Sequence, residues 1–334
     1  MMRYSYLFFV LILLAVTACK SDKKAKEPEK IKVIIDSDAN NELDDQHALA
    51  YAFLNPEVFD VLGVTVNNTD NGFGIQGQYD EALRIIKLFN LEDSVPLFKG
   101  ADNDYEEIAP HISESNFDGH AAVDFIISEA MKVKKGKLVL APIGKLTNVA
   151  LALLKEPKIK EKIKVVWLGG NYPSPGEYNL VNDITAVNPV IESGVEFEMV
   201  TVRYGQPTAT DAVRVTPDEI EQHMAGKGPV STDSIVGRHG GNFNRFGDYS
   251  KDLFDHANMH SYPPSRALFD MVVLAVLKNP AWGTKHEIPA PKLVGQAWED
   301  QPENPHKISY WDGFNRDGIV NDLFTKMEET TPEN

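Results

Sequence analysis

Short runs of aliphatic and β-branched residues alternate along the chain with segments whose apolar residues recur at helical spacing. The runs predict buried strands and the periodic segments predict helices that pack on them. We expect strands at 31–36, 59–66, 137–141 and 163–168, and helices at 44–54, 77–90, 121–133, 146–154 and 267–277. Alternating strands and helices indicate right-handed crossovers. The pattern therefore predicts an open, Rossmann-like α/β fold with a mainly parallel sheet covered by helices on both faces.

The first predicted strand leads directly into an unusually acidic stretch. Five acidic side chains lie within ten positions, namely Asp36, Asp38, Glu42, Asp44 and Asp45. Like charges repel, and burying them is costly unless a cation or hydrogen bonds compensate. We therefore expect a cation site built by the four aspartates, with a solvated acidic turn that caps a helix as the alternative.

Polar and small residues also follow the other predicted strands. Asn67 and Asn68 follow the second strand, Pro142-Ile143-Gly144 the third, and Gly169-Gly170-Asn171 the fourth. In open α/β sheets, ligands bind outside the carboxyl ends of the strands. Together with Asp36 and Asp38 after the first strand, these residues mark four strand ends, which we expect to form one rim around a binding site.

The middle of the chain adds two polar residues that alternate with apolar neighbours. Glu177 and Asn179 would face the same side of an extended segment, and both side chains can bind vicinal hydroxyls. Asp183 follows closely, and the alternative interpretation is that it only caps the helix that comes next.

One carboxylate, Asp270, lies on the strongly apolar segment 267–277. Burying an unpaired aspartate destabilises the fold, so a cation shared with the first acidic stretch would be a suitable partner for Asp270. The alternative is an ion pair with a nearby arginine such as Arg266.

Composition and the N-terminal segment set further expectations. A net charge of −16 with no basic, aromatic-rich patch argues against nucleic-acid polymers as partners. The only cysteine, Cys19, excludes an intramolecular disulfide and a cysteine-ligated metal site. An apolar run and small residues precede it, as in the lipobox of bacterial lipoproteins. We expect a signal peptide at 1–18, a flexible tether at 19–30 after a lipidated Cys19, and a single domain at 31–334.

Five short motifs, in order, resemble the inosine–uridine-preferring nucleoside hydrolase family. The family motifs are Asp-x-Asp-Pro-Gly-x-Asp-Asp, Gly-x-Leu-Thr-Asn, Met-Gly-Gly, Glu-Phe-Asn and a His-Asp pair on an apolar helix. In this chain they read Asp36-Ser37-Asp38 with Asp44-Asp45, Gly144-Lys145-Leu146-Thr147-Asn148, Leu168-Gly169-Gly170, Glu177-Tyr178-Asn179 and Phe269-Asp270. The resemblance covers residues 31 to 280 and implies a nucleoside hydrolase-like α/β domain.

The resemblance also implies a calcium-dependent N-glycosyl hydrolase acting on a small ribosyl substrate. The implied calcium ligands are Asp38, Asp45, Asp270 and the main-chain carbonyl of Ile143. Asp38 would also be the general base that activates the attacking water. The implied substrate-binding residues are Asp44, Asn179 and Asn67 or Asn68 at the ribose hydroxyls, Glu177 near the 5′-hydroxyl, and Leu168 at the strand end.

The chain departs from the family pattern in two places. The spacer between the aspartate pairs is two residues longer and carries Glu42, which would be a ligand or a helix cap. Phe269 replaces the family histidine, so the candidate acid for the leaving group is missing. The glycine-rich segment 237–262 is long enough for a lid, and we expect it to supply His239, an arginine or a stacking aromatic. A structural excursion on the surface is the alternative.

These expectations combine into a hydrolase of the N-glycosidic bond of a ribonucleoside or related N-ribosyl compound. It would be anchored by lipid in the bacterial cell envelope, facing the periplasm or the cell surface. Two alternatives stay open: a hydrolase of another ribosyl substrate, and a non-catalytic calcium-dependent ribose- or nucleoside-binding lipoprotein. The sequence also leaves open whether the protein forms a homo-oligomer. The C-terminal portion, with Trp298 and Trp311, is expected to cover the core without chemistry.

Overall fold

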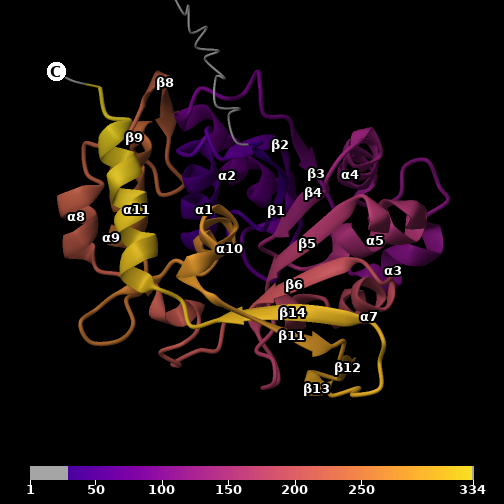
Figure 1. Ribbon diagram of the computed structural model, residues 1–334. Coiled ribbons are helices and arrows are strands. Elements are labelled where there is room, and N and C mark those ends of the chain that lie inside the picture. The colour runs from indigo at the N-terminus through magenta and orange to yellow at the C-terminus, as the bar shows by residue number, and fades with distance from the viewer. Residues whose placement is uncertain (1–28, 333–334) are drawn as a thin grey trace, which may run out of the picture.

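An eight-stranded sheet runs through the centre of the computed structural model, which describes residues 29–332 (Figure 1). Across the sheet the strands are β11 (Thr284–Pro289), β14 (Lys307–Asp312), β6 (Glu196–Val200), β5 (Ile163–Leu168), β4 (Leu138–Pro142), β1 (Ile31–Ser37), β2 (Phe59–Val66) and β3 (Leu97–Lys99). Each neighbouring pair is parallel except β11 and β14 at one edge. The predicted open, mainly parallel α/β fold is confirmed.

Helices cover both faces of this sheet and create two hydrophobic cores. Along β1, Val33 and Ile35 enter one core, while Ile34 enters the other, because successive side chains of a strand point to opposite faces. The first core is covered by α1 (Asp44–Phe53), α2 (Gly74–Leu88), α8 (Pro217–His223), α9 (Phe246–His256), α10 (Met271–Lys278) and α11 (Arg316–Glu329). The second is covered by α4 (His120–Lys132), α5 (Thr147–Lys155) and α7 (Ile184–Glu192), on the right in Figure 1.

Smaller elements complete the fold outside the main sheet. Three two-stranded sheets pair β7 (Arg214–Val215) with β10 (Arg266–Ala267), β8 (Val230–Val236) with β9 (Asn242–Arg245), and β12 (Lys292–Val294) with β13 (Ala297–Glu299). Two short α-helices are α3 (Tyr105–Ile108) and α6 (Tyr178–Asn182), and the 3₁₀ turns are η1 (Ala109–His111), η2 (Pro157–Glu161), η3 (Thr210–Ala212) and η4 (Pro280–Trp282).

As expected, the C-terminal portion covers the core through α11, but it also contributes strands to the main sheet. β14 is a strand of the main sheet between β6 and β11, and Trp311 on it is buried. The indole nitrogen of Trp311 donates a 2.7 Å hydrogen bond to Glu198 of β6. Glu198 also pairs with Lys164 and Lys285. The charged residues of β6 (EFEMV) and β14 (KISYWD) shorten the apolar runs of these strands, so their sequences are less clearly strand-like than those of β1 (IKVIIDS) or β5 (IKVVWL).

Two further sequence-based expectations need correction. The segment 237–262 is no irregular loop, because it contains β9 and the three-turn helix α9. The segment 267–277 is not helical throughout either. It begins with a residue of β10, and α10 starts only at Met271, so Asp270 occupies the N-cap position.

The expected signal peptide at 1–18, the lipidated Cys19 and nearly all of the 19–30 tether lie outside the described residues. None of the helices within residues 29–332 has the length and apolar composition that crossing a membrane requires.

Candidate active site

A cavity of about 540 Å³ lies at the carboxyl ends of the central strands. Asp38 follows β1, Ile143 follows β4 and Leu168 ends β5, so three strands contribute to its wall. Three of the four predicted strand ends therefore form a rim, whereas Asn67 and Asn68 at the end of β2 do not line this cavity. Other lining residues include Asn41, Glu42, Asp44, Asp45, Asn71, Glu177, Tyr178, Asn179, Tyr204, Arg214, His260, Arg266, Phe269 and Asp270.

Three buried carboxylates form the acidic cluster of this cavity: Asp44, Asp45 and Asp270. Asp44 and Asp45 are the first residues of α1, and Asp270 is the N-cap of α10, which packs against α1. One oxygen of each lies within 4.8 Å of the others. None of the three forms a salt bridge within residues 29–332, and Oδ1 of Asp270 has no hydrogen-bond partner there.

The electrostatics of the acidic cluster follow from this crowding. Burial, followed by the charges of Asp44 and Asp45, raises the pKa of Asp270 well above its usual value. Burial and the neighbouring aspartates do the same to the pKa of Asp45, and burial raises the pKa of Asp44 to about 6. A divalent cation would relieve both the desolvation and the repulsion.

The donor set of the acidic cluster fits calcium. Calcium takes roughly six to eight oxygen ligands from carboxylates, carbonyls and water. The cluster offers carboxylate oxygens alone, and one buried oxygen of Asp270 still lacks a partner within the described residues. The three residues that come together include Asp44, which the resemblance places at the sugar, while Asp38 lies beside them in the same cavity.

Asp38 is held next to the acidic cluster by its surroundings. Its Oδ2 accepts a 2.7 Å hydrogen bond from Thr69 Oγ1, and its side chain is buried. Burial raises the pKa of Asp38 to about 6, although the bond from Thr69 opposes the shift. A Cβ at Gly144 would lie 2.8 Å from Oδ1 of Asp38, so this close approach requires glycine.

Asp36 supports the turn rather than lining the cavity. Its carboxylate accepts hydrogen bonds from Thr65, Asn67 and Asn148, and its main-chain oxygen accepts one from the Ile143 amide at 2.8 Å. Burial raises the pKa of Asp36 to about 7, against these hydrogen bonds. The bonds tie the ends of β1, β2 and β4 together.

The lengthened spacer is fastened by two arginines. Glu42 forms an ion pair with Arg266, and its main-chain oxygen accepts a 2.7 Å hydrogen bond from Arg238. Leu43, and not Glu42, is the N-cap residue of α1. The alternative in which Arg266 satisfies Asp270 is therefore wrong, because Arg266 pairs with Glu42.

Glu177 and Asn179 lie at the start of the short helix α6 rather than on an extended segment. Glu177 is the N-cap, and its carboxylate accepts hydrogen bonds from the amides of Gly170, Asn179 and Leu180. Burial raises the pKa of Glu177 to about 7, although these bonds oppose the shift. The side-chain nitrogen of Asn179 donates 3.0 Å bonds to the carbonyls of Ile143 and Leu168. Both predicted residues line the cavity.

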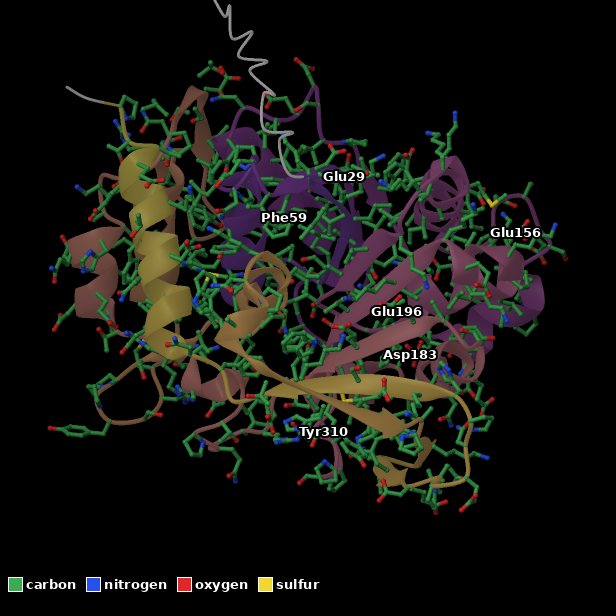
Figure 2. The ribbon with its side chains drawn as sticks, in the orientation of Figure 1. Glu29, Phe59, Glu156, Asp183, Glu196 and Tyr310 are labelled. Carbon is green, nitrogen blue, oxygen red and sulfur yellow. The ribbon has the colours of Figure 1, made fainter. Side chains whose placement is uncertain are left out.

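Asp183, labelled in Figure 2, is a helix cap. It is the N-cap of α7, and its carboxylate accepts hydrogen bonds from the Thr185 amide, the Tyr105 amide and the Thr147 hydroxyl. The capping interpretation is confirmed, and the same side chain joins α3 and α5 to α7.

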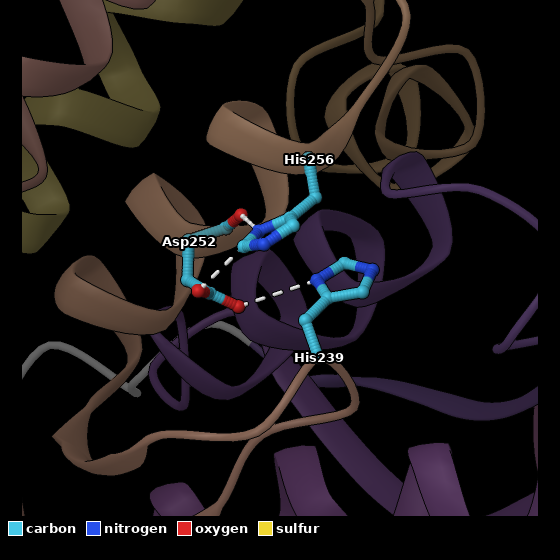
Figure 3. Close-up of side chains that lie close together, drawn as sticks. All are labelled: His239, Asp252 and His256. Atoms are coloured by element: carbon cyan, nitrogen blue, oxygen red, sulfur yellow. Dashed lines mark hydrogen bonds and ion pairs between the residues drawn. The ribbon is translucent and has the colours of Figure 1, made fainter.

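Three predicted substrate-binding residues lie elsewhere. Asn67 is buried behind Asp36, where it donates to the carboxylate and accepts from the Lys145 amide. Asn68 lines a neighbouring polar cavity. His239 lies outside the cavity, 3.3 Å from Asp252 (Figure 3).

Sequence reasoning missed several residues that do line the cavity. Asn71 follows the two asparagines after β2, and Tyr204 follows β6, a strand that carries no continuous apolar run. His260 of the segment 237–262 lines the cavity, whereas His239 of the same segment does not. Tyr204 packs edge-on against Phe269, with ring centroids 5.8 Å apart.

Comparisons with known proteins agree with this geometry. The family model described as inosine–uridine-preferring nucleoside hydrolase matches residues 33–318. The pyrimidine-specific ribonucleoside hydrolase RihB of Escherichia coli is 30% identical over 227 residues, which is 60% of this chain and 67% of RihB.

Solved structures of the same kind share the fold. The plant nucleoside hydrolase PpNRh1 superposes with a TM-score of 0.68 at 18% identity, covering 91% of this chain and 100% of that one. The purine-preferring ribonucleoside hydrolase from Gardnerella vaginalis gives a TM-score of 0.67 at 22% identity, covering 89% and 98%. With the family model matched over nearly the whole described chain, the protein belongs to the inosine–uridine-preferring nucleoside hydrolase family and is an N-glycosyl hydrolase.

Proposed function

We propose that the protein hydrolyses the N-glycosidic bond of a ribonucleoside or related N-ribosyl compound with calcium as its cofactor. The observation that carries this proposal is the acidic cluster, with its unpartnered Asp270 oxygen, in the wall of the cavity. The cavity volume of about 540 Å³ suits a nucleoside, because small-molecule sites usually measure roughly 300–1,000 Å³. Family membership supports the bond that is cleaved.

Asp44, Asp45 and Asp270 would hold the ion, with Asp38 and the Ile143 carbonyl beside them. Bound calcium would supply positive charge that polarises water and hydroxyl oxygens in the cavity. The main-chain oxygen of Ile143 already accepts one hydrogen bond from Asn179 and keeps its second lone pair for a ligand.

Asp38 is the proposed general base. Thr69 fixes one of its oxygens, which orients the carboxylate toward the cavity. The water oxygen bonds to the anomeric carbon while the bond from that carbon to the base nitrogen breaks. Asp38 takes the proton of the water, and the departing base keeps the bonding electron pair and acquires a proton.

The sugar would be gripped from two sides. Asn179 keeps its side-chain oxygen for a ribose hydroxyl, because its nitrogen is engaged with Ile143 and Leu168. Glu177 is held rigidly by three amides and is proposed near the 5′-hydroxyl. Fixed contacts of this kind strengthen as positive charge develops on the sugar.

The leaving group would face an aromatic part of the cavity wall instead of the acidic cluster. Phe269, Tyr204 and His260 line the same cavity, and two of these three side chains are aromatic carbon rings that can stack on a base. His260 is the proposed hydrogen-bonding group toward the base, in place of the family histidine that Phe269 replaces.

The test is hydrolysis by the full-length protein with a panel of purine and pyrimidine ribonucleosides. RihB is described as pyrimidine-specific and the Gardnerella enzyme as purine-preferring, so both classes belong in the panel. We expect free ribose from at least one nucleoside, and loss of the activity with a calcium chelator that added calcium reverses. Absence of ribose from every substrate, with nucleoside binding retained, would favour the non-catalytic binding protein instead.

We also propose that the domain at 31–334 is exported and held in the bacterial cell envelope by lipid on Cys19, after removal of 1–18. The motif around Cys19 supports this location. Labelling with a radioactive fatty acid should mark the wild type and not Cys19→Ser. Equal labelling of both would contradict the anchor.

A further inference from the structure

A second group of metal-ligating side chains lies apart from the acidic cluster, and we call it the histidine cluster: His239, Asp252 and His256. His239 is in the turn between β8 and β9, while Asp252 and His256 lie one turn apart on α9. One ligand atom from each residue lies within 4.8 Å of the others. Figure 3 shows both imidazole rings beside the single carboxylate.

The contacts within the histidine cluster converge on Asp252. Nδ1 of His239 is 3.3 Å from Oδ2 of Asp252, and Nδ1 of His256 is 3.5 Å from Oδ1. His256 Nδ1 also lies 2.8 Å from the main-chain oxygen of Asp252. The two rings stack with centroids 4.2 Å apart and an interplanar angle of 25°.

The geometry points to a transition-metal site, in which His239, Asp252 and His256 bind one divalent ion of the zinc class. Imidazole nitrogens suit zinc, nickel and copper, whereas calcium prefers sites made entirely of oxygen. Two histidines and one carboxylate leave room for water to complete a tetrahedral shell. The side chains of the three residues are 25%, 19% and 48% exposed, so an ion can reach them from solvent.

The position of the site gives the ion a structural effect. It would fasten the β8–β9 turn to α9, and the residue before His239 is Arg238, which donates to the main-chain oxygen of Glu42 in the acidic spacer. The bound ion would therefore hold the arginine that fastens this spacer. The inference stands on the histidine cluster alone and does not depend on the proposed nucleoside hydrolysis.

The test is zinc titration of the full-length protein, purified without a polyhistidine tag and saturated with calcium to occupy the acidic cluster. Calorimetry should detect one zinc ion per chain in the wild type. His256→Gln and His239→Gln should each weaken this binding by about tenfold or more, because each removes a ligand. Cobalt should give a visible absorption band that both variants lose.

Two controls make the outcome decisive. His111→Gln removes an exposed histidine that pairs with Glu114 and is far in sequence from the histidine cluster. This variant should leave zinc affinity unchanged. Asp270→Asn should also leave it unchanged, because that residue belongs to the acidic cluster. Zinc affinity that persists in both histidine variants, or that disappears in Asp270→Asn, would overturn the inference, as would a wild type that does not bind zinc.

Discussion

The acidic cluster and the histidine cluster both offer three metal-ligating side chains, but they differ in what surrounds them. Asp44, Asp45 and Asp270 are buried, carry the same charge and leave one oxygen of Asp270 without a hydrogen-bond partner in residues 29–332. In the histidine cluster the side chains are partly exposed, and the carboxylate lies within hydrogen-bond distance of an imidazole.

Burial and charge make a bound cation matter more at the acidic cluster than at the histidine cluster. Buried charges of one sign lose their hydration and repel one another, so a bound cation would stabilise the acidic cluster strongly. The residues of the histidine cluster are partly exposed. Water or the other residues of the cluster can therefore replace a metal ion as their partner with little change in the free energy of unfolding. Changes in the acidic cluster should therefore alter catalysis and stability, whereas changes in the histidine cluster should weaken zinc binding and, without zinc, leave catalysis and stability nearly unchanged.

The largest effect should come from Asp38→Asn, which separates catalysis from ion binding at the acidic cluster. Asparagine keeps an oxygen for the Thr69 hydrogen bond but cannot take a proton from water. We expect kcat with the best nucleoside to fall by about 10²- to 10⁴-fold, while calcium affinity measured by calorimetry changes much less. Asp252→Asn is the matched control from the histidine cluster and should keep wild-type turnover. Near-normal turnover of Asp38→Asn would remove Asp38 as the base.

Asp270→Asn should have the next largest effect, and its sign should depend on calcium. With a chelator present, the substitution removes a buried, repelled carboxylate, so the free energy of unfolding should rise by about 1–3 kcal/mol. With calcium at about 100 times its dissociation constant, the wild type should gain about 2.7 kcal/mol and the variant much less.

Urea unfolding with chelator and with calcium measures both halves of this prediction. Asp252→Asn should show no such reversal, because its carboxylate is partly exposed and lies beside two imidazoles. A variant that is less stable than the wild type in chelator, and equally stabilised by calcium, would exclude Asp270 from a cation site.

The parts of the fold that could be predicted from sequence are those with local signals. β1, β2, β4 and β5 are rich in apolar residues and most of their residues are buried, so composition alone identifies them. β6 and β14 could not be found this way, because Glu198 becomes acceptable in the core only through Lys164, Lys285 and Trp311 on other strands.

The candidate site divides along the same line. The aspartates of the first loop stand close together in sequence, and Asp270 stands out on an apolar segment, so their meeting could be anticipated. Pairing of Glu42 with Arg266 could not, because the partners are far apart in sequence and meet only through the packing of α1 against α10. The sequence also could not show that His260 lines the cavity and His239 does not. The position of His239 depends on its contact with Asp252, which lies on α9.

The ion pair between Glu42 and Arg266 is intermediate between the two clusters, since Arg266 is buried and the Glu42 side chain is 44% exposed. Glu42→Gln should lower the free energy of unfolding by about 1 kcal/mol, a value reduced by solvent screening, and added salt should shrink the difference. The matched control is Glu287→Gln, whose partner Lys307 is exposed, and it should have no measurable effect. A loss that is equal in both variants would show that burial of Arg266 does not strengthen the pair.

The smallest effect should come from His256→Gln without zinc. The ring is half exposed and its contacts with Asp252 can be replaced by water, so the free energy of unfolding should stay within about 0.5 kcal/mol of the wild type and turnover should not change. His47→Gln is the informative contrast, because His47 is buried, with Nδ1 2.6 Å from the Leu43 carbonyl and Nε2 2.7 Å from Ser250. Loss of those buried contacts should cost about 1–3 kcal/mol in the same urea experiment. A zinc-free His256→Gln as unstable as His47→Gln would mean that the histidine cluster supports the fold by its own contacts, and the contrast with the acidic cluster would then fail.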